Sequence, residues 1–225
     1  MTLVLNGWAS SPRAWDLCSF GRDALFSYAD QLAGRPEQAF AEEGAHILVG
    51  WSMGGSSALR LACRFPDRIA GLVLVAATPR MMEDKAANWR GLSPRRLEAL
   101  HYAIKLTHGE GFFGVPEGKP NPYQMDTDEN LAGGIRYLLE TDLREALADT
   151  FVRHPENVRF PVHIFQSEHD GVVRPENAAY LKTIFPQASL TLVPGTEHAL
   201  PIFIPELIDA AVADCHVDDG APSKT

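Results

Sequence analysis

Six short apolar segments, spaced along the chain and separated by helical stretches, constrain the fold more than any other feature. These segments are residues 2–5, 24–28, 46–50, 69–76, 162–166 and 189–193. Their short length and their content of leucine and β-branched residues are typical of parallel strands covered on both faces. Between them the sequence predicts helices over residues 35–43, 53–65, 175–184 and 201–215. This alternation predicts a doubly wound α/β domain with a mostly parallel sheet of about six strands.

One segment, residues 80–157, interrupts the alternation because it contains no convincing strand. Helices are expected over 93–107 and 130–151, separated by a loop rich in glycine and proline. Ser93-Pro94 fits a helix N-cap followed by proline at the first helical position. We therefore expect a helical cap inserted between two parts of the core, residues 1–79 and 158–216. The last residues, 217–225, are expected to form a flexible tail.

Charge and cysteine content exclude several classes of function. The 225 residues include 20 basic and 29 acidic side chains, and the net charge of −9 argues against nucleic acid as the main partner. The three cysteines show no CxxC spacing, which argues against a disulfide framework or a zinc site. No segment has the length of a signal peptide core or a membrane span. We expect a cytoplasmic monomer with no metal, cofactor or membrane contact.

A serine between glycines follows the third apolar segment. The residues Gly50-Trp51-Ser52-Met53-Gly54 match G-x-S-x-G, with a predicted strand before them and a predicted helix after them. In this setting the motif forms a strained elbow that lifts the serine hydroxyl clear of the sheet. The alternative is an ordinary Gly-Ser turn that opens a helix. The elbow predicts that Ser52 is a nucleophile, provided that its partners follow later in the chain.

A serine hydroxyl needs a base to take its proton and a carboxylate to orient that base. On a fold with this elbow the chain order is serine, then aspartate or glutamate, then histidine, each after a strand. Asp170 follows the strand expected over 162–166, and His198 follows the strand expected over 189–193. All three side chains should emerge at the same edge of the sheet. The order predicts a catalytic triad of Ser52, Asp170 and His198.

The same loops contain rivals for these roles. Glu168 is an alternative acid, but Asp170 is followed by glycine and two valines, which better fits a loop that turns its carboxylate inward. His169 is expected to point to solvent. Glu197 precedes His198 and could shift the pKa of the base, although a surface position is expected for it.

The tetrahedral intermediate of acyl transfer also needs two backbone N–H donors. One should be the amide of Met53, directly after the nucleophile, and the other should come from the loop after the first strand. We assign the second donor to Trp8. The rings of Trp8 and Trp51 flank the serine and are expected to wall a substrate pocket, with core packing as an equal alternative.

Four stretches carry a resemblance to a known family: residues 6–8 (NGW), 50–55 (GWSMGG), 65–76 (FPDRIAGLVLVA) and 133–144 (GGIRYLLETDLR). Through them the chain resembles the α/β-hydrolases and, more narrowly, the pimeloyl-acyl-carrier-protein methyl esterases of biotin synthesis. The likeness covers the first strand and most of residues 50–207. One departure is Asn6-Gly7, where the family usually has His-Gly.

The resemblance implies a serine carboxylesterase that removes a methyl ester from a pimeloyl chain on acyl carrier protein, through an acyl-enzyme. Acyl carrier protein is acidic, so it should dock on a locally basic face of the cap. The candidate docking residues are Arg90, Arg95, Arg96 and Arg136, with Arg144 as a further candidate. A solvated helix face is the alternative for these charges.

Apolar cap residues are expected to line an acyl tunnel or to pack the cap onto the sheet. They include Leu97, Leu100, Ile104, Phe112 and Phe113. Two other functions remain open: a broad short-chain esterase or thioesterase, and a binding protein that keeps the pocket without turnover.

Overall fold

The computed structural model describes residues 1–41, 43–107, 115, 117–124 and 126–217. At its centre is a six-stranded sheet, entirely parallel, with the order β2-β1-β3-β4-β5-β6. The strands are β1 (Thr2–Leu5), β2 (Ala24–Phe26), β3 (His46–Trp51), β4 (Ile69–Val75), β5 (Val162–Ser167) and β6 (Ser189–Val193). Because β2 and β3 lie on opposite sides of β1, the strand order reverses there, and a crevice opens at the carboxyl ends of strands at such a point.

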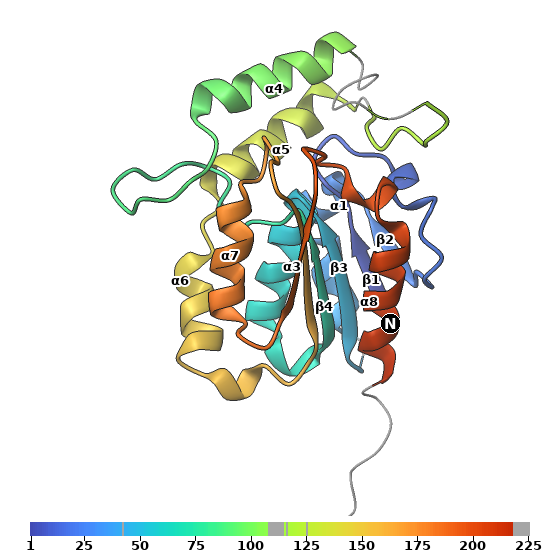
Figure 1. Ribbon diagram of the computed structural model, residues 1–225, viewed down its shortest axis with the longest axis vertical. Coiled ribbons are helices and arrows are strands. Elements are labelled where there is room, and N and C mark those ends of the chain that lie inside the picture. Colours follow the sequence, from blue (N-terminus) through green and yellow to red (C-terminus); the bar gives the residue numbers. More distant parts are fainter. Residues whose placement is uncertain (42, 108–114, 116, 125, 218–225) are drawn as a thin grey trace, which may run out of the picture.

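Helices cover both faces of this sheet (Figure 1). One face packs against α3 (Met53–Arg64), α6 (Arg144–Leu147) and α7 (Pro175–Ile184), and the other packs against α8 (Pro205–Val217). The doubly wound α/β fold expected from the sequence is confirmed. Over the described ranges, every helix is too short or too polar to cross a membrane.

Two more helices, α4 (Pro94–Thr107) and α5 (Asp128–Glu140), lie across the end of the sheet (Figure 1). Their inner side chains join a separate apolar cluster with Trp8, Met53 and the segment that follows β4. Leu147 and Phe151, by contrast, pack with strand and α3 side chains in the core. We therefore propose that the cap ends near residue 143 rather than at residue 157.

The structure corrects several of the expected elements, and one of them is the helix expected over 201–215, where a 3₁₀ turn (Leu200–Ile202) precedes the start of α8 at Pro205. The strand expected over 24–28 ends at Phe26, because Ser27 and Asp30 form a capping box that starts α1 (Tyr28–Leu32). The helix expected over 35–43 is one α-helical turn, α2 (Arg35–Gln38), followed by a 3₁₀ turn. The helix expected over 130–151 breaks between α5 and α6, where the amide of Leu143 donates to the carbonyl of Pro79.

The turn between β3 and α3 depends on glycine at three positions. A Cβ at Gly50 would lie 2.5 Å from the carbonyl oxygen of Gly54, and a Cβ at Gly54 would overlap the carbonyl oxygen of Leu5. A Cβ at Gly55 would overlap the side chain of Ala77. The lack of a side chain at these positions lets the start of α3 lie close against β1 and against Ala77, which follows β4.

We expect Gly54→Ala to lower the free energy of unfolding by about 2–3 kcal/mol, because the overlapping atom belongs to the backbone of β1 and cannot rotate away. Chemical denaturation monitored by circular dichroism would measure the loss. Gly21→Ala is the matched control, since a Cβ at Gly21 meets no atom within 4 Å. Equal stabilities of the two variants would contradict the close packing of α3 on β1.

Candidate active site

Three side chains from three loops meet at the carboxyl end of the sheet. Ser52 follows β3, Asp170 follows β5 and His198 follows β6. His198 Nε2 lies 2.9 Å from Ser52 Oγ, and His198 Nδ1 lies 2.8 Å from Asp170 Oδ2. All three are buried, with exposed fractions of 6%, 0% and 5% for the serine, aspartate and histidine. The structure thus brings together the residues that chain order singled out.

The backbone at Ser52 is held in a conformation that L-residues rarely adopt, with φ of 56° and ψ of −119°. Its carbonyl accepts hydrogen bonds from the amides of Gly55 and Ser56, and its amide donates to the carbonyl of Val75. Strain of this kind persists only where surrounding contacts enforce it. The elbow points the hydroxyl away from the sheet and toward His198, at the N-terminus of α3.

Asp170 is fixed on both of its carboxylate oxygens. Oδ1 accepts from the amides of Val172 (2.7 Å) and Val173 (3.1 Å), while Oδ2 accepts from Gln166 Nε2 (3.2 Å) as well as facing His198. The neighbouring Glu168 and His169 are both exposed. Gln166 was not identified from the sequence. It is the penultimate residue of β5, whose side chains are nearly all buried, and this is an unusual place for a polar side chain.

The loop that carries His198 is bound to the elbow and to β5. Trp51 Nε1 donates to the carbonyl of His198 at 2.9 Å, and Ser167 Oγ donates to the carbonyl of Glu197. Because a carboxylate oxygen only accepts hydrogen bonds, the proton between His198 and Asp170 lies on Nδ1. Nε2 is then the acceptor for the Ser52 hydroxyl proton. The geometry therefore suits proton transfer from the serine to the imidazole.

The loop after β1, where an oxyanion donor is expected, is anchored through Asn6. Its side-chain oxygen accepts from Trp15 Nε1 at 2.6 Å, and its carbonyl accepts from Gln31 Nε2 at 2.8 Å. Gly7 lies against the serine, since a Cβ at Gly7 would be 3.3 Å from Ser52 Cβ.

Both expected donors border the serine. Trp8 follows Gly7, and its indole N–H is fixed on the carbonyl of Leu131 at 3.1 Å. Met53 is the first residue of α3, so its amide has no acceptor within the helix. Assignment of these two amides as the oxyanion hole stays a prediction.

An apolar pocket lies next to the serine. Trp8 and Trp51 form part of its wall beside Ser52. Another part is formed by Leu97, Leu100 and Ile104 of α4. Apart from Ser52 and His198, its described lining offers few polar side-chain atoms. Phe112 and Phe113, the other expected lining residues, lie outside the described residues.

Sequence reasoning missed several other lining residues because they come from distant segments. Met81 and Leu92 lie at the two ends of a loop after β4, Leu138 belongs to α5, and Tyr123 precedes α5. Burial raises the pKa of Tyr123 well above its usual value, and the nearby Asp170 charge adds to this effect. The phenol therefore stays neutral in the wall of the pocket.

The candidate docking arginines fall into separate places. Arg95 and Arg96 are exposed near the start of α4. The guanidinium of Arg96 lies close to Gly171, since a Cβ added to that glycine would be 3.6 Å from Arg96 Nη2. Gly171 directly precedes Val172, which lines the pocket. Arg90 lines a neighbouring polar groove, whereas Arg136 lines a different groove beside α1. Arg144 is mostly buried in ion pairs with Asp84 and Asp142, so the interpretation of this residue as a docking group was wrong.

Known proteins that are similar to this chain have an α/β-hydrolase fold or are named as esterases. The family model described as "alpha/beta hydrolase fold" matches residues 6–205. A pimeloyl-[acyl-carrier protein] methyl ester esterase from Edwardsiella ictaluri is 27% identical, covering 97% of this chain and 93% of its own. One from Aliivibrio fischeri is 25% identical, covering 88% and 86%. An esterase structure from Exiguobacterium antarcticum superposes with a TM-score of 0.69 at 16% identity, covering 96% and 91%.

Proposed function

Because the chain belongs to the alpha/beta hydrolase family and is a carboxylic ester hydrolase, we propose that it removes the methyl ester from a pimeloyl chain carried by acyl carrier protein. The observation that carries the proposal is the continuous hydrogen-bonded relay from Asp170 through His198 to Ser52 beside an apolar pocket. The relatives named above support the choice of ester.

In the proposed reaction, Ser52 Oγ attacks the ester carbonyl while His198 Nε2 takes the hydroxyl proton. The negative charge on the carbonyl oxygen is stabilised by the amides of Trp8 and Met53. His198 then gives its proton to the methoxy oxygen, and methanol leaves. Water, deprotonated by His198, attacks the acyl-enzyme in the same way, which releases the carboxylate and restores Ser52.

The pocket lining supports an acyl substrate rather than a charged one. Leu97, Leu100 and Ile104 present methyl groups to the space beside Ser52, and no lysine or arginine is among the described residues of the lining. Each methylene buried against such a wall contributes roughly 0.8 kcal/mol to binding. A free carboxylate would lose its hydration there without gaining a partner, so an esterified end should enter the pocket in preference to a free acid.

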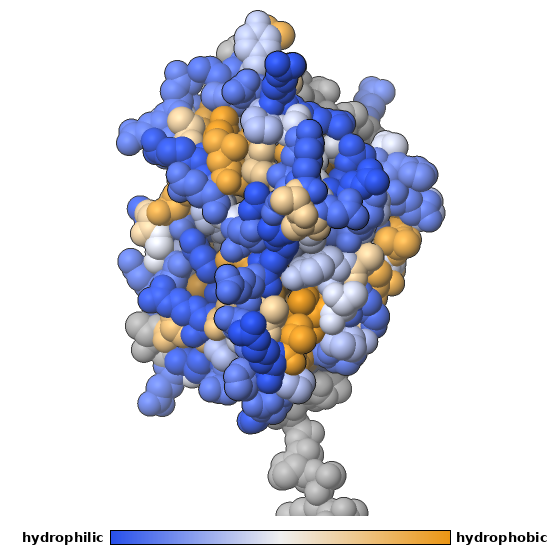
Figure 2. Space-filling model, turned by 90° about the vertical axis from the view of Figure 1, so that its left-hand side faces the viewer, coloured by the Kyte–Doolittle hydropathy of each residue, from blue (hydrophilic) through white to orange (hydrophobic). Residues whose placement is uncertain are grey.

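The charges around the pocket support an acidic carrier. Lys85, Arg90, Arg95 and Arg96 are exposed, and none forms an ion pair with another described residue. Hydrophobic side chains on the face of Figure 2 lie in small separate areas among hydrophilic ones. Docking through charge would speed encounter with an acidic partner in a salt-dependent manner.

We expect Arg95→Glu/Arg96→Glu to lower kcat/KM for the carrier-bound pimeloyl methyl ester by roughly 10-fold or more, because like charges now face the carrier. The rate with free dimethyl pimelate should change by less than about 2-fold, since a neutral ester does not sense these charges. Steady-state kinetics at two salt concentrations would measure both.

Arg136→Glu is the matched control, because Arg136 is also exposed but lines a different groove. Equal losses for both substrates in the double variant would contradict docking at α4. Equal kcat/KM of the wild-type protein for carrier-bound and free esters would instead favour a broad short-chain esterase or thioesterase.

A further inference from the structure

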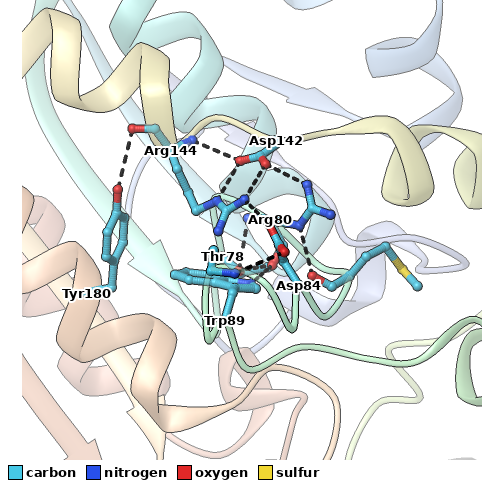
Figure 3. Close-up of polar contacts among 9 residues, drawn as sticks. Thr78, Arg80, Asp84, Trp89, Asp142, Arg144 and Tyr180 are labelled. Carbon is cyan, nitrogen blue, oxygen red and sulfur yellow. Dashed lines mark hydrogen bonds and ion pairs between the residues drawn. The ribbon is translucent and has the colours of Figure 1, made fainter.

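Figure 3 shows a cluster of charged and aromatic side chains that includes none of the catalytic residues. Arg144 Nη2 bonds to Asp84 Oδ2 at 2.8 Å and to Asp142 Oδ2 at 2.7 Å. Arg80 Nη1 also bonds to Asp142 Oδ2, at 2.5 Å. The Arg144 guanidinium lies over the ring of Trp89, 5.3 Å from its centroid. The two arginines and two aspartates thus balance in charge.

This cluster holds a hairpin-like loop, residues 81–92. Asp84 and Trp89 pair across the loop through both backbone amides, and the amide of Leu92 donates to the carbonyl of Met81. Met81 and Leu92, at the base of the loop, line the pocket. The charged contacts therefore act on the same short segment that supplies one wall of the pocket.

The other side of the cluster is anchored to the core and to α5. Tyr180 of α7 donates its hydroxyl to the carbonyl of Arg144 and packs edge-on against Trp89, with centroids 5.1 Å apart. Asp142 and Arg144 lie just after α5, which contributes Leu138 to the pocket. Removal of the Arg144 guanidinium would leave Asp84 without its ion-pair partner and Trp89 without the cation over its ring. The loop would keep the packing of Trp89 against Tyr180, but it would lose its charged link to the segment after α5.

We propose that Arg144 is a positioning residue that fixes the Met81–Leu92 wall and thereby sets how well the enzyme accepts long acyl chains. The proposal rests on the assignment of this pocket to the acyl chain. A short acyl group bound at Ser52 needs no contact with that wall, whereas a longer chain buries its methylenes against it. A less firmly held wall should therefore lower kcat/KM for esters of long acyl chains and leave kcat/KM for short ones unchanged.

The charges remain paired over the range in which an esterase would be assayed. The Arg144 hydrogen bonds lower the pKa of Asp142 to about 2, and they also lower the pKa of Asp84. Both carboxylates are thus ionised at neutral pH, and the stability that Asp142 contributes is lost only as the pH falls from the ordinary aspartate pKa to the lowered pKa of about 2.

The test uses two variants. Arg144→Met keeps an apolar side chain over Trp89 but removes the guanidinium. Asp84→Asn removes the charge of the other partner in the Arg144–Asp84 ion pair, on the loop. We expect kcat/KM for p-nitrophenyl hexanoate to fall by roughly 10-fold in each, mainly through KM, because contacts with one or two methylenes are lost. In both variants, kcat/KM for p-nitrophenyl acetate should stay within about 2-fold of the wild-type value. The double variant should lose little more than either single variant.

Arg60→Met is the matched control. Arg60 likewise pairs with a carboxylate, Glu37, at 3.0 Å and lies over an aromatic ring, that of Tyr137, but it does not contact the loop. Its ratio of hexanoate to acetate rates should equal that of the wild type. Thermal unfolding of every variant identifies a folding defect, and Asp84→Asn carries the test if Arg144→Met does not fold.

Equal losses for acetate and hexanoate, or a fall in melting temperature with an unchanged ratio, would overturn the proposal and leave the cluster a structural role only. These esters carry no carrier protein, so the outcome does not depend on the proposed pimeloyl substrate. Failure of that substrate would appear instead in the paired carrier-bound and free-ester kinetics.

Discussion

Ser52→Ala is expected to lower kcat for ester hydrolysis by about 10⁴–10⁶-fold, with little change in stability. Ser52 Oγ is the atom that faces His198 Nε2, and alanine leaves nothing to attack the carbonyl carbon. The loss of one hydroxyl at a strained elbow removes no packing contact of the core. His198→Ala should lower kcat by about the same factor. The double variant should lower kcat little further, because the two groups act as one unit.

Ser57→Ala is the matched control for this change. Ser57 is also buried, lies on the next turn of α3 and bonds to the Tyr137 hydroxyl at 3.2 Å, but it does not contact His198. We expect it to keep near-normal kcat. Near-normal activity in Ser52→Ala, measured by steady-state hydrolysis with folding checked by circular dichroism, would refute the assignment of the nucleophile.

Asp170→Asn is expected to lower kcat by about 10⁴-fold while preserving the shape of the loop. The amides of Val172 and Val173 require an acceptor at Oδ1, so an asparagine would turn its oxygen toward them and its NH₂ group toward His198. His198 Nδ1 would then have to accept rather than donate, which places the proton on Nε2. An imidazole in that tautomer cannot take the Ser52 proton.

Glu168→Gln separates the two candidate acids of this loop. Glu168 is exposed, and Asp170 alone of the two faces the imidazole. We expect Glu168→Gln to hydrolyse esters at the wild-type rate across the pH range. A large loss in Glu168→Gln together with a small loss in Asp170→Asn would reverse the assignment.

The positions of the strands and of the three site residues could be predicted because each depends on local sequence and one topological rule. Buried parallel strands need continuous apolar runs, so β3, β4 and β5 were located to within a residue or two. Residues that follow parallel strands meet at one edge of the sheet. That rule placed Asp170 and His198 near Ser52 without knowledge of any distance.

Features that depend on contacts between distant segments could not be predicted in this way. The proposed role of Arg144 as a positioning residue depends on Asp84, which is 60 residues away in the sequence. The sequence alone does not distinguish a paired arginine from a solvent-exposed one. The start of α1 did carry a local signal, since Ser27 and Asp30 have the spacing of a capping box. An apolar run before it concealed that signal.

The most direct test of the account is to locate the covalent adduct that forms with a fluorophosphonate. Intact-mass and peptide mass spectrometry should find one adduct per chain, on Ser52, with ester hydrolysis lost in proportion to labelling. His198→Ala should label far more slowly, because the hydroxyl then lacks its base. An adduct on a different residue, or hydrolysis that continues in fully labelled protein, would contradict the claim that Ser52 carries the acyl group.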